Sequence, residues 1–150
     1  MPTLINNKKV GFNYELLDRF EAGIELFGWE VKSLREKQGS LDGAHVIVRG
    51  EEVFLVGMHI PPYQQANAPK DSDPDRTRKL LLTKKEIGEL LGAEKQKGLT
   101  VVPISLYTKG RKIKMEIAIA RGKKKRDKRE TIKKKDTQRD VEREIKVRLR

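Results

Sequence analysis

The chain has no cysteine, two histidines and few aromatic residues, with four phenylalanines, three tyrosines and one tryptophan among 150 residues. Without cysteine it cannot form a disulfide framework, a thiolate metal site or a cysteine nucleophile. No apolar run approaches the ~20 residues that cross a bilayer, so we expect no membrane span. The first residues, MPTLINNKKVGF, lack the apolar stretch of a secretory signal, which predicts a cytoplasmic protein.

Residues that could support catalysis are scarce. His45 and His59 both fall in predicted strands, where a histidine more often packs or lies half exposed than acts as a general base. The acidic run DSDPD, residues 71–75, contains proline and is typical of a turn rather than of a two-metal carboxylate cluster. The chain has no glycine-rich phosphate loop and no nucleophile motif. We therefore expect no enzymatic activity, no metal and no cofactor.

Positive charge is concentrated at the C-terminal end. Residues 121–150 carry 15 lysines and arginines against 6 acidic residues, whereas residues 1–120 carry 19 against 16. A concentrated basic block predicts a polyanionic partner. Nucleic acid fits better than an anionic membrane surface, because the block has no aromatic residue to insert into lipid.

The same basic block is predicted to be disordered in the free protein. Its few large apolar side chains cannot offset the entropy of ordering thirty residues. It nevertheless contains a latent helix, because Val141, Ile145 and Leu149 recur every four residues and no proline interrupts them. We expect this helix to form when the tail is bound to RNA.

The first 120 residues have mainly the pattern of β-strands. Apolar side chains alternate over Phe12–Leu26, which is the period of a strand with one buried face. Two hairpins are predicted. One joins AHVIV to VFLVGMHI around Gly50, and the other spans residues 99–120 with a turn at Lys109-Gly110.

Short helices interrupt these strands. One is predicted within residues 28–39 and is closed by glycine, and another follows Thr83, which is spaced from Glu86 as a capping box and ends at Gly98. About six strands favour a small antiparallel OB-like β-barrel, since closure removes exposed edges. The predicted fold is mainly β: a barrel over residues 1–120 with two or three short helices, then a disordered basic tail over 121–150, in a monomer.

Four segments of the chain resemble a single family. They are EAGIELFGWEVKSLRE (Glu21–Glu36), DPDRTRKLLL (Asp73–Leu82), KGLTVVPISLY (Lys97–Tyr107) and ARGKKKRDKRE (Ala120–Glu130). In this order they closely resemble the SmpB (small protein B) family, the bacterial partners of transfer-messenger RNA, and the resemblance covers nearly the whole chain. It implies a non-catalytic protein that binds the tRNA-like domain of transfer-messenger RNA and carries it to stalled ribosomes. The tail, helical once bound to the ribosome, would enter the decoding centre and the empty mRNA channel, and the incomplete peptide would be tagged.

The resemblance assigns RNA contacts to Glu21, Leu81 and Lys114. Glu21 and Lys114 each lie between inward-facing neighbours, so both are expected to point outward. There the carboxylate can accept hydrogen bonds from RNA, unless it forms a surface ion pair with a nearby lysine, and Lys114 can reach a phosphate or remain solvated. Leu81 is expected on the outer face if the run LLL is a strand.

The remaining predicted RNA contacts are polar or basic side chains in three places. They are Asn7, Lys8 and Lys9 near the N-terminus, Arg76, Arg78 and Lys79 as a cationic patch after the proline-rich loop, and Lys32 and Arg35 one helical turn apart. Phosphate contacts of this kind position RNA without reading its sequence. Lys32 and Arg35 either join the patch or face solvent.

The tail contains two motifs that the resemblance links to ribosome function. The matching residues are Gly122, Lys123 and Lys124 in GKK and Asp127, Lys128 and Arg129 in DKR. Arg126 stands where relatives often have a histidine or an aromatic residue. A guanidinium can also stack on a base plane, so a stacking role is expected there.

Two other functions remain open from the residues alone. A general single-strand RNA- or DNA-binding OB protein would need exposed aromatic rings, whereas Phe12, Tyr14 and Phe20 are assigned to a buried face. A structural ribosomal protein could instead thread the basic tail through rRNA, and it would then remain on every ribosome.

Overall fold

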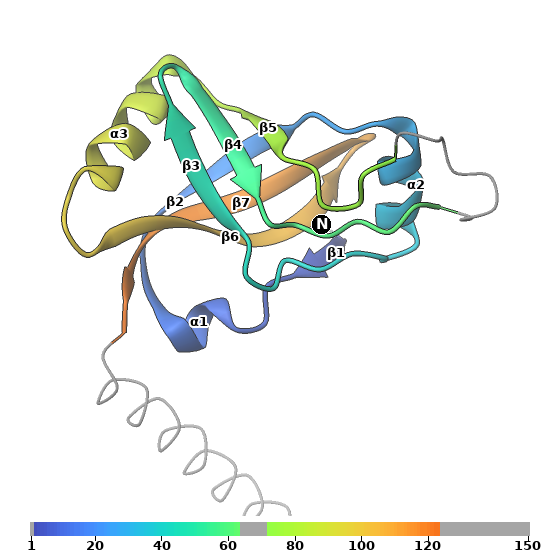
Figure 1. Cartoon of the computed structure of the whole chain (residues 1–150), viewed down its shortest axis with the longest axis horizontal. Coiled ribbons are helices and arrows are strands. Elements are labelled where there is room, and N and C mark those ends of the chain that lie inside the picture. Colours follow the sequence, from blue (N-terminus) through green and yellow to red (C-terminus); the bar gives the residue numbers. More distant parts are fainter. Residues whose placement is uncertain (1, 64–71, 124–150) are drawn as a thin grey trace, which may run out of the picture.

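The computed structural model describes residues 2–63 and 72–123. Within these ranges the chain forms seven strands, all in one antiparallel sheet, and three helices (Figure 1). In chain order the elements are β1 (Thr3–Asn6), α1 (Val10–Asn13), β2 (Tyr14–Ile24), α2 (Gly28–Arg35), β3 (His45–Arg49), β4 (Glu52–Val56), β5 (Arg78–Leu81), α3 (Lys84–Glu94), β6 (Leu99–Lys109) and β7 (Lys112–Gly122). The predicted mainly β fold is confirmed.

The sheet closes into a barrel-like ring. Its strand order is β1-β6-β3-β4-β5-β2-β7, and β7 also pairs with β6. Six strands therefore form the ring, and β1 pairs with β6 outside it. The β2–β7 and β6–β7 pairings run along most of their strands, whereas β3 and β6 meet at Val46 and Val101. Closure satisfies the backbone groups that an open sheet would leave at its edges.

One apolar core fills the ring, and Figure 1 shows α2 and α3 at its two ends. Leu34 of α2 and Leu90 of α3 are both fully buried in this core, so each helix packs its apolar side against the strands. The largest fully buried strand residues of the core are Leu55, Leu80, Leu106, Met115 and Ile117. Among the described residues, no helix is both long and apolar enough to traverse a bilayer.

Both predicted hairpins and the capped helix are confirmed. Gly50 (φ 64°) begins the turn between β3 and β4, and Gly110 (φ 64°) begins the turn between β6 and β7. Glycine reaches this left-handed region without steric cost. At the start of α3, the Thr83 hydroxyl accepts the Glu86 N–H at 3.2 Å, and the Glu86 carboxylate accepts the Thr83 N–H at 3.1 Å.

Some element boundaries differ from the prediction. Phe12 lies in α1, so the first long strand begins at Tyr14 rather than at Phe12. α2 ends at Arg35 and is closed by Lys37 in the left-handed region (φ 58°) rather than by glycine. α3 likewise ends at Glu94, before Gly98. These ends depend on local hydrogen bonds that residue type alone does not predict.

β4 is also shorter than predicted. It ends at Val56 because Gly57 adopts a φ of 87°, which leaves the extended region. His59 therefore lies beyond the strand, in an isolated bridge with Ser40.

Candidate nucleic-acid interface

The ring places Leu81, Gly23, Lys114 and Tyr107 in one row across four strands. Leu81 of β5 pairs with Gly23 of β2, Gly23 pairs with Lys114 of β7, and Lys114 pairs with Tyr107 of β6. Directly paired residues point to the same side of a sheet. Leu81 is 49% exposed while Leu80 is buried, so this row lies on the outer face, as predicted for Leu81 and Lys114. We call it the Leu81 row.

Gly23 allows Leu81 to lie close to β2. A Cβ atom built on Gly23 would lie 3.2 Å from the Cβ of Leu81, which is tighter than an ordinary van der Waals contact. Any side chain at this position would therefore push Leu81 away from β2. The glycine of the EAG segment thus has a packing role in the row.

A groove of about 330 Å³ adjoins the Leu81 row. Its apolar lining comes from Ile24, Leu26, Val31, Leu81 and Ile113, and its cationic lining comes from Arg35, Arg111, Lys112 and Lys114. Arg35 Nη2 donates a hydrogen bond to the carbonyl oxygen of Arg111 at 3.3 Å, which ties α2 to the β6–β7 turn. The groove therefore combines apolar surface with four positive charges.

Glu21 lies on the outer face of β2, two residues from Gly23. Its carboxylate oxygens accept hydrogen bonds from Lys109 Nζ at 3.2 and 3.4 Å, which is the predicted alternative of a surface ion pair. These hydrogen bonds from Lys109, together with a smaller effect of the nearby Tyr107 hydroxyl, lower the pKa of Glu21. Burial and the contact with Glu21 raise the pKa of Tyr107 to about 12. At neutral pH, Glu21 is thus a charged acceptor beside a neutral hydroxyl donor.

The predicted cationic patch of Arg76, Arg78 and Lys79 is wrong for Arg78. Arg78 has no exposed surface, and its Nε and Nη1 donate hydrogen bonds to Glu30 Oε2 and the Met58 carbonyl oxygen, both at 2.6 Å. It therefore cannot reach an RNA phosphate. The reason is the buried carboxylate of Glu30, because an arginine is stable in a core only when its charge is paired.

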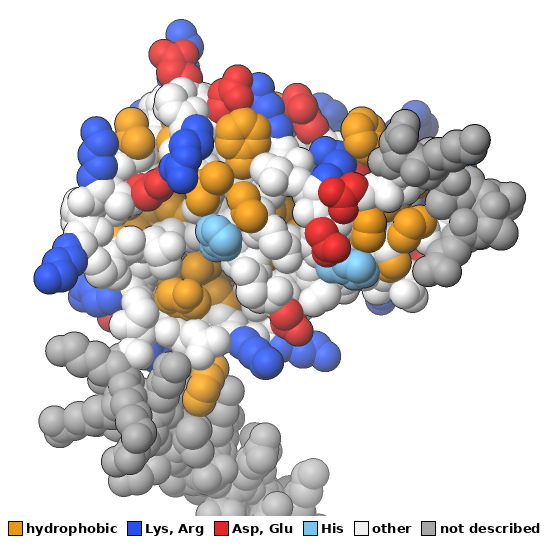
Figure 2. All heavy atoms as spheres, viewed as in Figure 1, with side chains coloured by type: hydrophobic (Ala, Val, Ile, Leu, Met, Phe, Trp, Pro, Cys, Tyr) orange, Lys and Arg blue, Asp and Glu red, His pale blue; other side chains and the backbone are white. Residues whose placement is uncertain are grey.

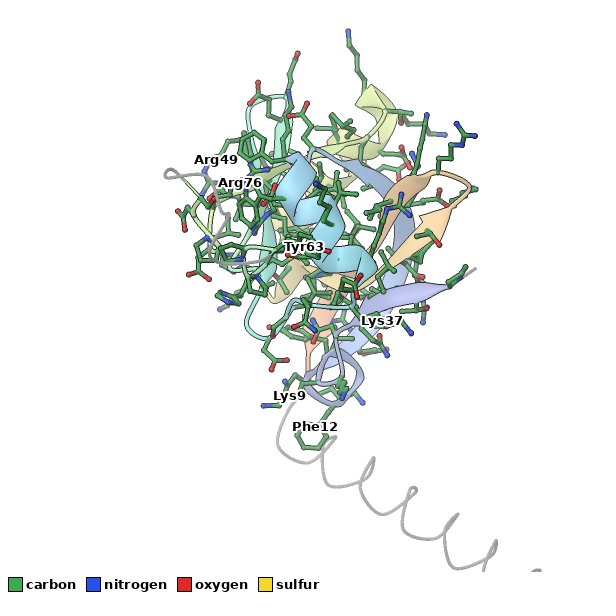
Figure 3. All side chains as sticks on the ribbon, turned by 90° about the vertical axis from the view of Figure 1, so that its right-hand side faces the viewer. Lys9, Phe12, Lys37, Arg49, Tyr63 and Arg76 are labelled. Atoms are coloured by element: carbon green, nitrogen blue, oxygen red, sulfur yellow. The ribbon has the colours of Figure 1, made fainter. Side chains whose placement is uncertain are left out.

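Arg76 is also held by Glu30. Its Nη2 and Nε donate to the two Glu30 carboxylate oxygens at 2.5 and 3.1 Å, and its guanidinium carbon lies 4.1 Å from the centre of the Phe27 ring. Figure 3 labels Arg76 on the side away from Lys37. Only 22% of the Arg76 side chain is exposed, and Lys79 lies 3.8 Å from Glu52, so both cations already have acidic partners.

Burial by itself raises the pKa of Glu30, but hydrogen bonds from Arg76, the Phe27 N–H and Arg78 outweigh it and lower the pKa overall. Glu30 is therefore ionised at neutral pH and pairs with both guanidinium groups. No sequence pattern in WEVKSLR distinguished this buried glutamate from a surface one.

The N-terminal residues lie away from the Leu81 row. Figure 3 labels Lys9 beside Phe12, at the end of the molecule opposite Arg76. Lys8 and Lys9 are exposed there, whereas the Asn7 side chain donates a hydrogen bond to the Pro103 carbonyl oxygen at 2.9 Å and so fastens this segment to β6. The structure does not bring these residues together with Glu21 or Lys114.

The two basic residues of α2 also separate. Arg35 lines the groove, whereas Lys32 Nζ lies 6.0 Å from the centre of the Tyr63 ring, which Figure 3 labels in front of α2. Lys32 is exposed but is not among the groove residues. Of the pair, only Arg35 belongs to the candidate site.

The sequence prediction missed Tyr107, Lys109, Arg111 and Lys112. All four lie at or beside the β6–β7 turn, and three of them are cations within the segment TKGRK. Cations clustered around a hairpin glycine were an available signal. Their proximity to Leu81 depends on the β2–β5 and β2–β7 pairings.

The first residues of the predicted tail belong to the folded body. Gly122 is the last residue of β7 and pairs with Tyr14. Lys123 donates its backbone N–H to the Asn13 carbonyl oxygen and its Nζ to the Gly11 carbonyl oxygen, both at 2.9 Å. The predicted boundary at residue 120 is therefore too early. Lys124, Arg126, Asp127, Lys128 and Arg129, and the predicted tail helix, lie outside the described residues.

The histidines and the acidic loop have local roles. Figure 2 shows the two histidines as separate patches on one face. His59 Nδ1 lies 2.8 Å from Asp75 Oδ1, and Asp73 accepts the Asp75 N–H at 2.9 Å, which confirms the predicted turn. Within residues 2–63 and 72–123, no three histidine or acidic side chains are grouped as metal ligands would be.

Comparison with known proteins identifies the family. The family described as SmpB protein matches residues 4–147. The chain belongs to the SmpB family. Proteins named SsrA-binding protein from Burkholderia vietnamiensis and Paraburkholderia xenovorans are 46% and 45% identical to it over 138 residues, which is 92% of this chain and 93% of each relative.

A solved structure supports the same family assignment. It is described as "tmRNA-SmpB: a journey to the center of the bacterial ribosome". Its matching chain is 40% identical, with a TM-score of 0.69, and the match covers 83% of this chain and 87% of that one. The family resemblance seen in the sequence is therefore confirmed.

Proposed function

We propose that this protein binds the tRNA-like domain of transfer-messenger RNA and delivers it to stalled ribosomes, where incomplete peptides are tagged. The observation that carries the proposal is the convergence of Glu21, Leu81 and Lys114, which come from three strands, on one outer face beside a cationic groove. The relatives' name, SsrA-binding protein, and the description of the similar solved structure, which names tmRNA and SmpB, support transfer-messenger RNA as the partner.

The chemistry of this face suits a folded RNA. Lys114, Arg111 and Lys112 can neutralise phosphates, which supplies affinity and orientation without sequence preference. Leu81 offers an exposed apolar contact beside them, and Glu21 can accept hydrogen bonds from base amino groups or 2′-hydroxyls. The arrangement pairs non-specific attraction with a few groups that fix the register of the RNA.

A second part of the proposal concerns the opposite end of the molecule. β7 leaves the ring beside α1, away from α2 (Figure 1), and Lys8 and Lys9 directly precede α1 in the chain. A cytoplasmic, non-catalytic factor could therefore hold its RNA at the Leu81 row while the segment that follows Lys123 enters the decoding centre and vacant mRNA channel. The GKK and DKR motifs and Arg126 would act there.

Competition binding at one fixed salt concentration tests the RNA specificity. A folded tRNA-like RNA should displace an unstructured strand of equal length, because the face presents groups arranged for a shaped surface. Lys114→Ala should weaken binding and reduce the slope of log affinity against log salt by about one unit, as expected for one lost phosphate contact.

Lys85→Ala provides the matched control, because Lys85 is an exposed lysine on α3, at the end of the ring away from α2. It should leave both the affinity and the salt slope unchanged. Equal binding of the two RNAs by the wild-type protein would instead support a general single-strand binder. An equal loss in Lys114→Ala and Lys85→Ala would contradict the assigned face.

A further inference from the structure

We propose that Phe27 is a stacking platform for one unpaired RNA base and that the guanidinium of Arg76 supports its ring from beneath. The inference rests on the proposed RNA-binding function and extends the RNA-binding face to an aromatic ring outside the groove. Phe27 is the N-cap residue of α2, and the guanidinium carbon of Arg76 lies 4.1 Å from the centre of its ring (Figure 3).

The Phe27 ring is open to solvent on one side. Among residues 2–63 and 72–123, Phe27 is the only aromatic residue that is more than half exposed, at 56%. Arg76 covers one face of the ring, so the exposed surface includes the opposite face. A ring that served only to pack against Arg76 would gain stability by burying both faces, because apolar surface left in water forgoes that gain. The open face is therefore available to a planar partner.

Arg76 is fixed as a support for the ring rather than as a phosphate ligand. Its Nε and Nη2 donate to the two Glu30 carboxylate oxygens at 3.1 and 2.5 Å. Nη2 also donates to the Glu25 carbonyl oxygen at 3.2 Å, and Nη1 donates to the Thr77 carbonyl oxygen at 3.3 Å. All three guanidinium nitrogens are thus engaged at the edge of the group, which leaves its faces for stacking. A planar cation held in this way orients the ring before RNA binds.

Phe27 continues the face that carries the groove. Glu21 and Gly23 face outward on β2, and Phe27 falls at the same two-residue period in a chain that is still extended there (φ −80°, ψ 162°). Val31 and Arg35 follow Phe27 by four and eight residues, so they lie on the same side of α2, and both line the groove. The ring therefore lies roughly 12 Å along α2 from Arg35, at the end of the groove nearer the start of the helix.

The charges of the groove favour an RNA base as the partner over an apolar protein surface. Arg35, Arg111, Lys112 and Lys114 attract a phosphate backbone to the groove. Bases in loops and bulges of a folded RNA are unstacked and pack on aromatic side chains. A backbone held along the groove can thus present one unpaired base to the ring. A single open ring fits one such base better than the successive bases of an unstructured strand, which need several platforms.

Substitution of Phe27 in the full chain tests the stacking with a tRNA-like RNA. Phe27→Leu keeps an apolar side chain but removes the flat ring, so it should weaken binding about fivefold or more, the lower end for one stacked base. Phe27→Tyr keeps the ring and should bind within about twofold of the wild type. Neither change removes a phosphate contact, so the slope of log affinity against log salt should equal that of the wild type, unlike the slope of Lys114→Ala.

A scan with abasic nucleotides identifies the base and separates stacking from a structural effect. Each RNA of the set lacks the base at one unpaired position. At one position the wild type should lose about as much affinity as Phe27→Leu loses with the intact RNA. Phe27→Leu should lose nothing further at that position, because the same contact is removed from either side. A purely structural effect of the substitution would instead add to every abasic loss.

Leu17→Ala is the matched control, because Leu17 is an exposed apolar residue of β2 that lies beside α3 rather than α2. It should leave the affinity for RNA unchanged. Urea denaturation checks that the variants fold. The Phe27 N–H donates to Glu30 Oε1 at 2.7 Å, and every substitution at this position retains that backbone group. The denaturation midpoints of Phe27→Leu and Phe27→Tyr should therefore lie close to that of the wild type.

The outcomes separate this inference from the proposed function. If the wild type shows no preference for the tRNA-like RNA over an unstructured strand, the proposed function fails, whereas the abasic scan still decides whether Phe27 stacks on a base. If Phe27→Leu binds RNA like the wild type, or if its loss adds to that of every abasic position, the inference is overturned. Full affinity for RNA with weaker binding to ribosomes would overturn it too and would assign the ring to a contact on the ribosome. A non-additive abasic position together with an unchanged salt slope would support it.

Discussion

Glu30 connects α2 to the segment that leads into β5. Its carboxylate accepts hydrogen bonds from Arg76, from Arg78 and from the Phe27 N–H at the start of α2. α2 carries Arg35 of the groove, and β5 carries Leu81. A side chain with no exposed surface therefore sets the relative position of two elements of the candidate RNA-binding face.

Glu30→Gln should lower the free energy of unfolding by about 3–5 kcal/mol, because the change leaves the buried Arg78 guanidinium without its counter-charge. Urea denaturation at pH 7 measures the loss. Glu36→Gln is the matched control, since Glu36 is exposed at the other end of α2 and should shift the midpoint little. Equal midpoints for wild type and Glu30→Gln would contradict the role of the cluster.

The wild type and Glu30→Gln should also differ in how their stability depends on pH in the acid range. Since the pKa of Glu30 is lowered in the fold, its contribution is present above the usual carboxyl pKa and is lost as pH falls through the lowered value. The wild type should therefore lose more stability than Glu30→Gln between neutral pH and that lowered pKa.

At the scale of an element, the C-terminal end of α2 is closed by a lysine in a backbone conformation that glycine usually adopts. Lys37 has a φ of 58°, in the left-handed region, and Figure 3 labels its side chain at the surface. Its N–H donates to the Leu34 carbonyl oxygen, and the Gln38 N–H donates to that of Ser33, both at 2.9 Å. This pattern closes a helix and usually contains glycine at the left-handed position.

Lys37→Gly should raise the free energy of unfolding by about 0.5–1 kcal/mol, because relief of left-handed strain exceeds the added entropy of the unfolded chain. Lys95→Gly is the control at the end of α3, where the backbone is right-handed (φ −76°). There glycine should instead destabilise by up to about 1 kcal/mol. Thermal or urea denaturation of both variants measures these changes. A lower free energy of unfolding in Lys37→Gly than in the wild type would contradict the prediction.

At the scale of the molecule, the groove and the end of β7 lie at different ends of the ring. The groove lies between α2 and the β6–β7 turn, whereas β7 ends at Gly122 beside α1. This separation is consistent with a division in which the body holds RNA and the segment after Lys123 acts on the ribosome. Lys123 is fastened to the body by its contacts with Asn13 and Gly11, so a deletion should begin after it.

Removal of residues 124–150 should leave the affinity for the tRNA-like RNA within about threefold at moderate salt, where long-range attraction from the tail is screened. It should abolish peptide tagging in a reconstituted translation reaction, because the segment proposed to act on the ribosome is removed. Loss of RNA binding together with tagging would contradict the division. Full tagging by the truncated protein would contradict it equally.

Features that depend only on residues close together in the chain were predictable from the sequence. The hairpin turns at Gly50 and Gly110 and the cap at Thr83 follow from the conformational freedom of glycine and from a hydrogen bond across three residues. The outward direction of Leu81 follows in the same way from the alternation of a strand. Family resemblance supplied the importance of Glu21, Leu81 and Lys114, and register placed them on one face.

Burial of charge, by contrast, was decided only by the tertiary structure. Arg78 and Lys114 are both basic residues near RNA-binding motifs, so both were candidate contacts. Arg78 is buried and paired with Glu30, whereas Lys114 lies on the outer face. Glu30 is 48 residues from Arg78 in the chain, and Lys109 is 88 residues from Glu21. Free energies of charged groups depend on the nearest opposite charge and on exclusion of water, and both are properties of the closed ring.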